Sequence, residues 1–256
     1  MGDFAARQIA AFLRLRIPPS PAVYAVLFDI DGTLIQTGGA GQLAFAETFA
    51  ELFAVHELSG AVPFAGRSDR AIACELMRVH GVPANDENWQ RFREVYLGKL
   101  PRTLERREGR VLTGVIELLD ELERHEYPLI GLLTGNLEDG ARHKLTYYGL
   151  ADRFGFGGYG DVSDDRCQIA VAALVEAERT AKSRNGRANG KPLLSGAMVI
   201  GDTVHDISCA RSINAFAVAV PTGNTSAEEL RAAGPDLLLD DLSDPRPLME
   251  VVHANR

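Results

Sequence analysis

Short apolar runs that each end beside a glycine or a polar residue recur along the chain, and this repetition constrains the fold most. The first run, YAVLF, occupies residues 24–28 and lies between Pro21 and an Asp-Gly pair. A run this short and this apolar is typical of a strand buried on both faces. Similar runs at residues 127–133, 197–200 and 215–220 predict further strands, and residues 236–239 and 154–159 are weaker candidates.

Helical patterns separate these predicted strands. Leu137, Ala141, Leu145 and Tyr148 recur at a spacing of three to four residues, which places them on one face of a helix. Strands that alternate with helices indicate a parallel sheet with crossover helices, so we expect a doubly wound α/β fold. In such sheets ligands bind beyond the carboxyl ends of the strands.

Residues 38–110 interrupt the alternation, because they contain several helical patterns in a row and no convincing strand. We therefore expect an α/β core formed by residues 1–36 and 111–256, with a helical cap formed by residues 37–110 and inserted after the first core strand. Near the N-terminus we expect a short amphipathic helix that ends before Pro18. Residues 181–192, rich in glycine, asparagine and basic residues, predict an exposed loop.

Charge and cysteine content exclude several classes of protein. The 256 residues carry a net charge of −8, which leaves no basic surface for a nucleic-acid backbone. The three cysteines form no CxxC pair, which suits a reducing compartment. Charged residues interrupt the apolar N-terminal segment, so we expect neither a secretory signal nor a membrane span there. We expect a cytoplasmic protein with no nucleic-acid or membrane partner.

Two acidic pairs follow two of the predicted strands. Asp29 and Asp31 lie two residues apart after the first strand, and Asp202 and Asp206 follow the strand at 197–200. Carboxylates at the end of a buried strand repel one another unless a cation or protons offset their charge. Carboxylate and carbonyl oxygens are the ligands that a hard divalent cation prefers. The two pairs therefore predict a metal site, with magnesium as the expected ion.

Three strings, in order along the chain, carry a resemblance to a known family. They are FDIDGTL at residues 28–34, LLTGN at 132–136 and GDTVHD at 201–206. With them the sequence resembles the haloacid dehalogenase superfamily, and within it the phosphatases of the phosphoglycolate phosphatase and β-phosphoglucomutase type. That subgroup places a helical cap where residues 37–110 lie. The resemblance spans nearly the whole chain.

The resemblance implies a role for each acidic residue. Asp29 is expected to be the nucleophile that forms an aspartyl-phosphate. Asp31 is expected to protonate the leaving oxygen and then to activate water. Magnesium would be held by Asp29, the backbone carbonyl of Asp31 and Asp202, with Asp206 acting from behind these ligands or through water.

Further residues are expected to bind the substrate. Thr134, with the backbone amides of Gly135 and Asn136, would donate hydrogen bonds to the phosphoryl oxygens. In the cap, Arg67 follows a glycine in a loop that faces the active site in similar proteins, and it is the candidate contact to an anionic leaving group.

The third motif of the family departs from its usual form. A lysine or arginine is expected after the third strand to neutralise the phosphate and the nucleophile, and many relatives have a Lys-Pro pair there. Here Arg166 opens a predicted helix at the right point in the order. Lys191 precedes Pro192 but lies immediately before the fourth-motif strand. We place the motif at Arg166 and keep Lys191 as the alternative.

The implied activity is magnesium-dependent hydrolysis of a small phosphorylated metabolite. Two alternatives stay open at this point. A phosphomutase of the β-phosphoglucomutase type would return the phosphoryl group to a sugar, and a non-catalytic relative would only bind phosphate. The complete set of acidic residues favours catalysis over binding alone. Phosphoglycolate, sugar phosphates and nucleotide monophosphates all remain candidate substrates, and the oligomeric state is open.

Overall fold

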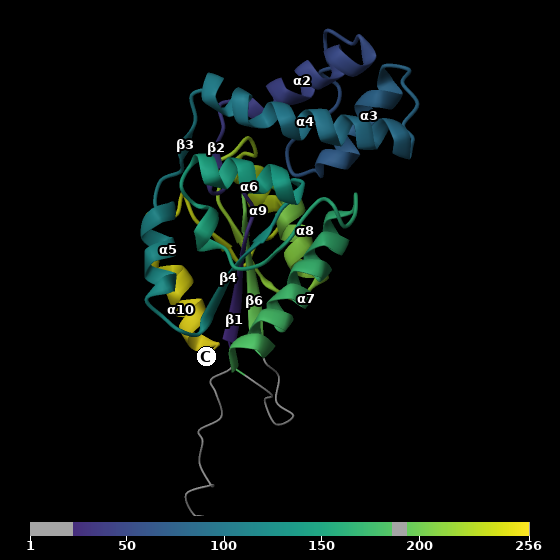
Figure 1. Cartoon of the computed structure of the whole chain (residues 1–256). Coiled ribbons are helices and arrows are strands. Elements are labelled where there is room, and N and C mark those ends of the chain that lie inside the picture. Colours follow the sequence, from purple (N-terminus) through teal and green to yellow (C-terminus); the bar gives the residue numbers. More distant parts are fainter. Residues whose placement is uncertain (1–22, 186–193, 256) are drawn as a thin grey trace, which may run out of the picture.

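In the computed structural model, which describes residues 23–185 and 194–255, six parallel strands form a central sheet (Figure 1). The order is β5-β4-β1-β6-β7-β8. After β1 the chain forms β4 and β5 on one side of that strand, and then β6, β7 and β8 on its other side. The crevice of such a doubly wound sheet lies where the direction changes, beside β1. The strands are β1 (Val23–Phe28), β4 (Pro128–Leu133), β5 (Gly157–Gly158), β6 (Leu194–Gly201), β7 (Phe216–Ala219) and β8 (Leu237–Leu238).

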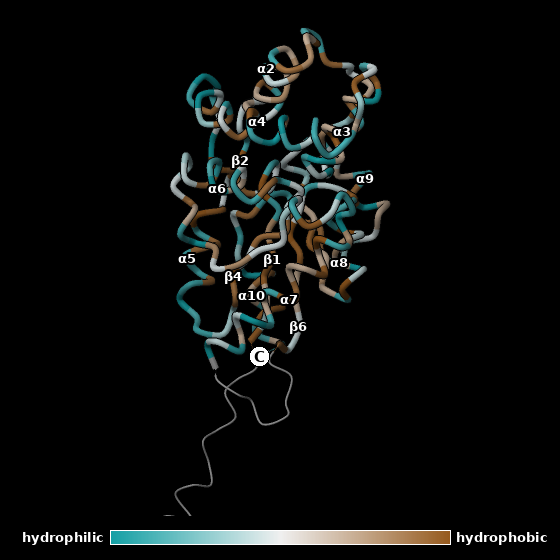
Figure 2. Tube along the Cα trace, turned by 45° about the vertical axis from the view of Figure 1, so that its right-hand side comes forward, coloured by the Kyte–Doolittle hydropathy of each residue, from teal (hydrophilic) through white to brown (hydrophobic). Residues whose placement is uncertain are grey.

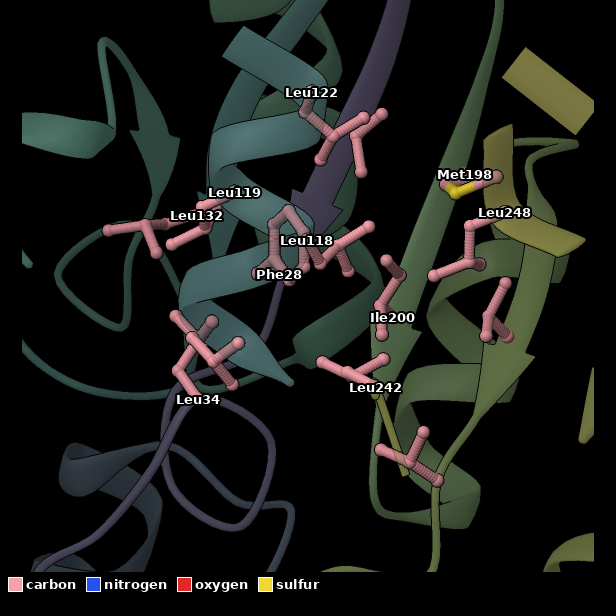
Figure 3. Close-up of a cluster of buried hydrophobic side chains, with 14 of the residues drawn as sticks. Phe28, Leu34, Leu118, Leu119, Leu122, Leu132, Met198, Ile200, Leu242 and Leu248 are labelled. Carbon is pink, nitrogen blue, oxygen red and sulfur yellow. The ribbon is translucent and has the colours of Figure 1, made fainter. Parts of the chain in front are cut away.

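Helices cover both faces of the sheet. Successive residues of β1 point to opposite faces, so Tyr24, Val26 and Phe28 join one apolar cluster, drawn in part in Figure 3, and Ala25 and Leu27 join another. In Figure 2, hydrophobic residues concentrate along the central strands. The first cluster packs against α5 (Val115–Glu123), α6 (Glu138–Tyr147), the short 3-10 helix η1 (Ala151–Arg153) and α10 (Arg246–Ala254), and the second against α7 (Arg166–Asn185), α8 (Val204–Ser212) and α9 (Ala227–Ala232).

The predicted doubly wound parallel sheet is confirmed, including both weaker strand candidates, which form the edge strands β5 and β8. The expected N-terminal helix before Pro18 lies outside the described residues, as does most of the expected loop at residues 181–192. The first part of that segment is instead the end of α7. In the part of the chain that the structure describes, no helix is long and apolar enough to cross a membrane.

Three consecutive helices lie above the carboxyl ends of the strands (Figure 1). They are α2 (Ala40–Phe53), α3 (Asp69–Val79) and α4 (Asp86–Arg106). Their own apolar cluster is rich in aromatic rings: Phe45 contacts Phe92 and Tyr96 with ring centroids 4.8 Å apart. Leu137, at the start of α6, also belongs to this cluster. We propose that these helices form the cap, with residues 37–110 as its extent.

A two-stranded antiparallel ribbon, which the sequence did not predict, joins the segments that enter and leave these helices. It pairs β2 (Ile35–Gln36) with β3 (Arg110–Val111). Strands of two residues are too short to show an alternating pattern, so sequence periodicity cannot reveal them. The ribbon holds both connections beside the end of β1, where the polar residues of the first motif follow.

Replacing Leu118 with alanine tests the packing of α5 on the sheet. Leu118 is fully buried in the first cluster, so its truncation should lower the free energy of unfolding by about 2–5 kcal/mol. Ile116 lies in the same helix but is exposed, and Ile116→Ala should change stability by about 0.5 kcal/mol or less. Urea unfolding of both variants measures the difference. Equal losses would contradict the described orientation of α5.

Candidate active site

Asp29 and Asp31 are positioned by the end of β1 and the tight turn that follows it. The backbone N–H of Asp29 donates to the carbonyl of Ile200, which extends the sheet pairing to this residue. Gly32 then adopts a left-handed backbone, with φ of 89°. A Cβ atom at Gly32 would lie 2.4 Å from the Asp202 carboxylate, so only glycine fits there. Asp29 is thereby buried, while the side chain of Asp31 is 41 % exposed and lines a cavity.

Three buried carboxylates meet at this edge of the sheet. Oxygen atoms of Asp29, Asp202 and Asp206 lie within 4.8 Å of one another. Burial raises the pKa of Asp202 to about 8, and the charges of Asp206 and Asp29 add to the rise. Burial and the same crowding raise the pKa of Asp29 as well. A divalent cation among these oxygens would favour their ionised forms, and an all-oxygen donor set fits a hard cation such as magnesium.

Both carboxylate oxygens of Asp206 already have partners. Oδ2 accepts hydrogen bonds from the backbone N–H of Thr203, at 3.1 Å, and from its hydroxyl, at 2.6 Å, in a capping box that begins α8. Oδ1 accepts a hydrogen bond from Arg166. Asp202 is less engaged: among the described residues, the side-chain donor to its carboxylate is the Thr33 hydroxyl, 3.4 Å from Oδ1. Of the two acids after β6, Asp202 is therefore the one better placed to ligate an ion directly.

Arg166, the first residue of α7, reaches into the same cluster. Its side chain is 8 % exposed, with Nη1 3.5 Å from Asp29 Oδ1 and Nη2 bonded to Asp206. Burial alone would lower the pKa of Arg166, but the Asp206 and Asp29 carboxylates outweigh it and the pKa is raised. The guanidinium therefore offsets part of the crowded negative charge. Lys191, the alternative residue for this position, lies outside the described residues.

The loop after β4 brings Thr134, Gly135 and Asn136 beside Asp31. The Asn136 side-chain amide donates to Asp31 Oδ2 and to Thr134 Oγ1, both at 2.8 Å. The backbone N–H of Asn136 donates to Thr134 Oγ1 at 3.3 Å. In the structure the Thr134 hydroxyl is thus the acceptor of this amide, and its donation to a phosphoryl oxygen stays a prediction.

The loop before α3 packs directly on the loop after β4. A Cβ at Gly135 would lie 2.2 Å from the Arg67 carbonyl oxygen, so the close approach requires glycine. The backbone N–H of Asp69 donates to the Gly135 carbonyl, and Asp69 Oδ2 accepts from the backbone N–H of Leu137 at 2.9 Å. Burial raises the pKa of Asp69 to about 6. The helices above the sheet are thus docked on the core through this loop.

Arg67 lies in that loop and lines the cavity, but its guanidinium already has partners. It donates to the Pro63 carbonyl at 3.3 Å and forms an ion pair with Glu75 at 2.5 Å. These two contacts leave other N–H donors of the guanidinium, so the expected contact to an anionic leaving group stays a prediction.

Sequence reasoning missed two buried charged residues at this site, Lys144 and Asp69. The ammonium group of Lys144 lies 2.6 Å from Asp31 Oδ2 and 2.6 Å from Asn136 Oδ1. A signal for Lys144 was present, because it lies three residues after Ala141 and therefore on the apolar stripe of its helix. Asp69 had no comparable signal, since an acidic residue in the first turn of a helix is ordinary.

These residues surround a cavity of about 500 Å³ between the core and the helices above it. A volume in this range suits a small ligand. Chemically, a buried carboxylate can act as a nucleophile and a second carboxylate beside it as an acid or base. An arginine and a cation held by oxygen donors can compensate the charge of an anionic ligand. The wall nearest the sheet includes Asp29, Asp31, Thr134, Arg166 and Asp202, and the opposite wall includes Phe45, Phe64, Arg67, Asp69 and Tyr96.

Comparisons with known proteins found phosphatases and hydrolases of similar sequence or fold. The chain is 25 % identical over 230 residues to the pyrophosphatase PpaX of Listeria monocytogenes, covering 87 % of this chain and 94 % of the relative. It is 29 % identical over 233 residues to the probable phosphatase IndB of Dickeya dadantii, covering 86 % and 90 %. The structure of a hydrolase from Pseudomonas syringae superimposes with a TM-score of 0.62 at 22 % identity, covering 89 % and 98 %.

The family assignment rests on a broader match. The model of the haloacid dehalogenase-like hydrolases matches residues 26–211, which include all three motif strings and Arg166. The resemblance stated from the sequence is thereby confirmed, and the chain belongs to the haloacid dehalogenase-like hydrolase family.

Proposed function

We propose that this hydrolase is a magnesium-dependent phosphatase that cleaves phosphomonoesters of small metabolites through an aspartyl-phosphate on Asp29. One observation carries the proposal: Asp29 and Asp31 line the same cavity, with Arg166 beside the first and a cluster of oxygen donors within reach. The phosphatase names of the relatives PpaX and IndB support phosphoryl transfer as the chemistry.

In the first proposed step, a carboxylate oxygen of Asp29 attacks phosphorus and the bond to the leaving oxygen breaks. Asp31 gives its proton to that oxygen, so the leaving group departs as a neutral alcohol. In the second step, Asp31 takes a proton from water as the water oxygen attacks the phosphorus of the aspartyl-phosphate. Asp29 is then released as a carboxylate together with inorganic phosphate.

Arg166 is proposed to support both steps from its position against Asp29. Its fixed positive charge stabilises the ionised nucleophile and offsets charge on the phosphoryl oxygens. Thr134 is proposed to donate to a phosphoryl oxygen through its hydroxyl, and Gly135 and Asn136 to complete that part of the site. Arg67, which lines the cavity, is proposed to contact an anionic leaving group.

Magnesium would be held by Asp29, Asp202 and the backbone carbonyl of Asp31. When bound, it would neutralise the phosphate and the nucleophile as they approach each other. Asp206, whose oxygens are bonded to Arg166 and Thr203, is proposed to act behind these ligands by orienting Arg166.

Replacement of Asp29 by asparagine tests the proposed nucleophile. Asp29→Asn should lower turnover of 4-nitrophenyl phosphate at least about 1,000-fold, because covalent catalysis is lost while the side-chain shape is kept. Asp152 is exposed and does not line the cavity, so Asp152→Asn is the matched control and should retain wild-type turnover. An Asp29→Asn enzyme with more than about a tenth of wild-type turnover would contradict the assignment.

Removal of magnesium tests the proposed metal site. EDTA should abolish activity, magnesium should restore it, and calcium should substitute poorly because it favours looser, higher coordination. Magnesium should also raise the melting temperature of the wild type, because a ligand bound to the folded state stabilises it. The Asp202→Ala variant should lose this thermal response. If the magnesium dependence of Asp202→Ala equals that of the wild type, Asp202 is not a magnesium ligand.

Arg166 and Lys191 are distinguished by three substitutions. Arg166→Ala should lower kcat about 100-fold, equivalent to roughly 3 kcal/mol of transition-state stabilisation. Arg166→Lys should recover only part of this loss, since lysine lacks the fork that contacts two carboxylates. Lys191→Ala should have nearly wild-type kcat and KM. The reverse pattern, with Lys191→Ala impaired and Arg166→Ala normal, would show that Lys191 is the cation of the third motif.

A further inference from the structure

Lys144 is a buried lysine at the edge of the catalytic cavity. It belongs to α6, is 4 % exposed, and lines the cavity. A buried ammonium group is costly unless hydrogen-bond acceptors and a negative charge compensate it. Here Asp31 Oδ2 and Asn136 Oδ1 each accept a hydrogen bond at 2.6 Å, which uses two of its three donors.

These bonds determine how the Asp31 carboxylate is presented. Oδ2 accepts from both Lys144 Nζ and Asn136 Nδ2, so two N–H donors on different segments fix its position. Asn136 is held in turn by Thr134. Among the described residues, no hydrogen bond to Asp31 Oδ1 is formed, which leaves this oxygen for the substrate. Because Oδ2 accepts from two N–H donors, it has no room to carry a proton as well. The proton that Asp31 transfers is therefore carried by Oδ1.

Lys144 also lies between the core and the helices above it. Burial raises the pKa of Asp69, and the positive charge of Lys144 opposes this rise. Asp69 is itself bonded to the backbone N–H of Leu137, just before α6 begins. Lys144 therefore compensates the charge of Asp31 in the core and that of Asp69 in the loop before α3.

We propose that Lys144 is a positioning residue that orients Asp31 for proton exchange with the leaving oxygen, an inference that rests on the proposed phosphatase function. If Lys144 contributed only to stability, its loss would lower kcat/KM for all substrates to the same extent. A lysine that acts through Asp31 affects most the substrates whose leaving group needs a proton, and this difference can be measured.

The experiment compares kcat/KM for two substrates of similar shape, phenyl phosphate and 4-nitrophenyl phosphate. The phenolate leaving group is strongly basic and requires protonation, whereas 4-nitrophenolate is weakly basic and departs without it. In Lys144→Met, kcat/KM for phenyl phosphate should fall about 100-fold, and that for 4-nitrophenyl phosphate less than about 10-fold. Because kcat/KM reports the steps up to the first irreversible one, comparing it between the two substrates isolates the transfer of the phosphoryl group to Asp29.

Three further variants sharpen the comparison. Lys144→Arg keeps the charge and should recover part of the loss on phenyl phosphate. Adding Lys144→Met to Asp31→Asn should cause little further loss, because both changes act through one group. Lys99→Met is the matched control, since Lys99 is paired with Glu51 on the outer surface and does not line the cavity; it should leave both substrates unaffected.

Equal losses on both substrates in Lys144→Met, or additive losses with Asp31→Asn, would overturn the proposal. If Lys144→Met fails to fold, Lys144→Arg carries the same comparison, and equal losses there would overturn it too. The proposed function fails separately: Asp29→Asn would then retain activity whatever the Lys144 variants do. An inactive Asp29→Asn together with equal losses in Lys144→Met would refute only the role of Lys144.

Discussion

The crowding of negative charge beyond β1 and β6 is the constraint on which the rest of the site depends. Asp29, Asp202 and Asp206 lie within a few ångströms of one another and are buried, which by itself disfavours the folded state. Arg166 compensates part of this charge by contacting Asp29 and Asp206. The capping box with Thr203 binds the remaining oxygen of Asp206. In the proposed reaction a bound cation offsets the rest of this negative charge and that of the anionic substrate.

The backbone around the carboxylates is packed so closely that several positions admit no side chain. A Cβ at Gly223 would lie 1.7 Å from Asp202 Oδ2, and one at Gly32 would lie 2.4 Å from it. The close approach at Gly135 lets the loop before α3 settle on the loop after β4. Glycine in these places is a packing requirement, and it allows two walls of the cavity to approach without side chains between them.

Much of this arrangement could be predicted from the sequence. Apolar runs located the strands, and the rule that parallel strands end at one edge of a sheet placed Asp29 and Asp202 near each other. Lys144 was missed because only the apolar residues on the buried face of its helix were considered, and this lysine lies on the same face. Asp69 was missed because its partners lie on α6 and on the loop after β4, and contacts between distant segments leave no local pattern. The hydrogen bond from Asn136 to Asp31 likewise follows from tertiary packing. The division into core and cap, and the roles of the site residues, stay predictions.

The central place of β1 also has a consequence for biosynthesis. Tyr24 pairs with Pro128 on one side and with Gly196 on the other, so both neighbours of this strand are made long after it. Such distant pairings slow folding, because a long loop must close before the contacts form. A nascent chain that has emerged only as far as α4 therefore carries an uncovered apolar strand with both edges unpaired, which is an aggregation hazard. The strand that delivers Asp29 to the site is made first and is sheltered only after β6 has left the ribosome.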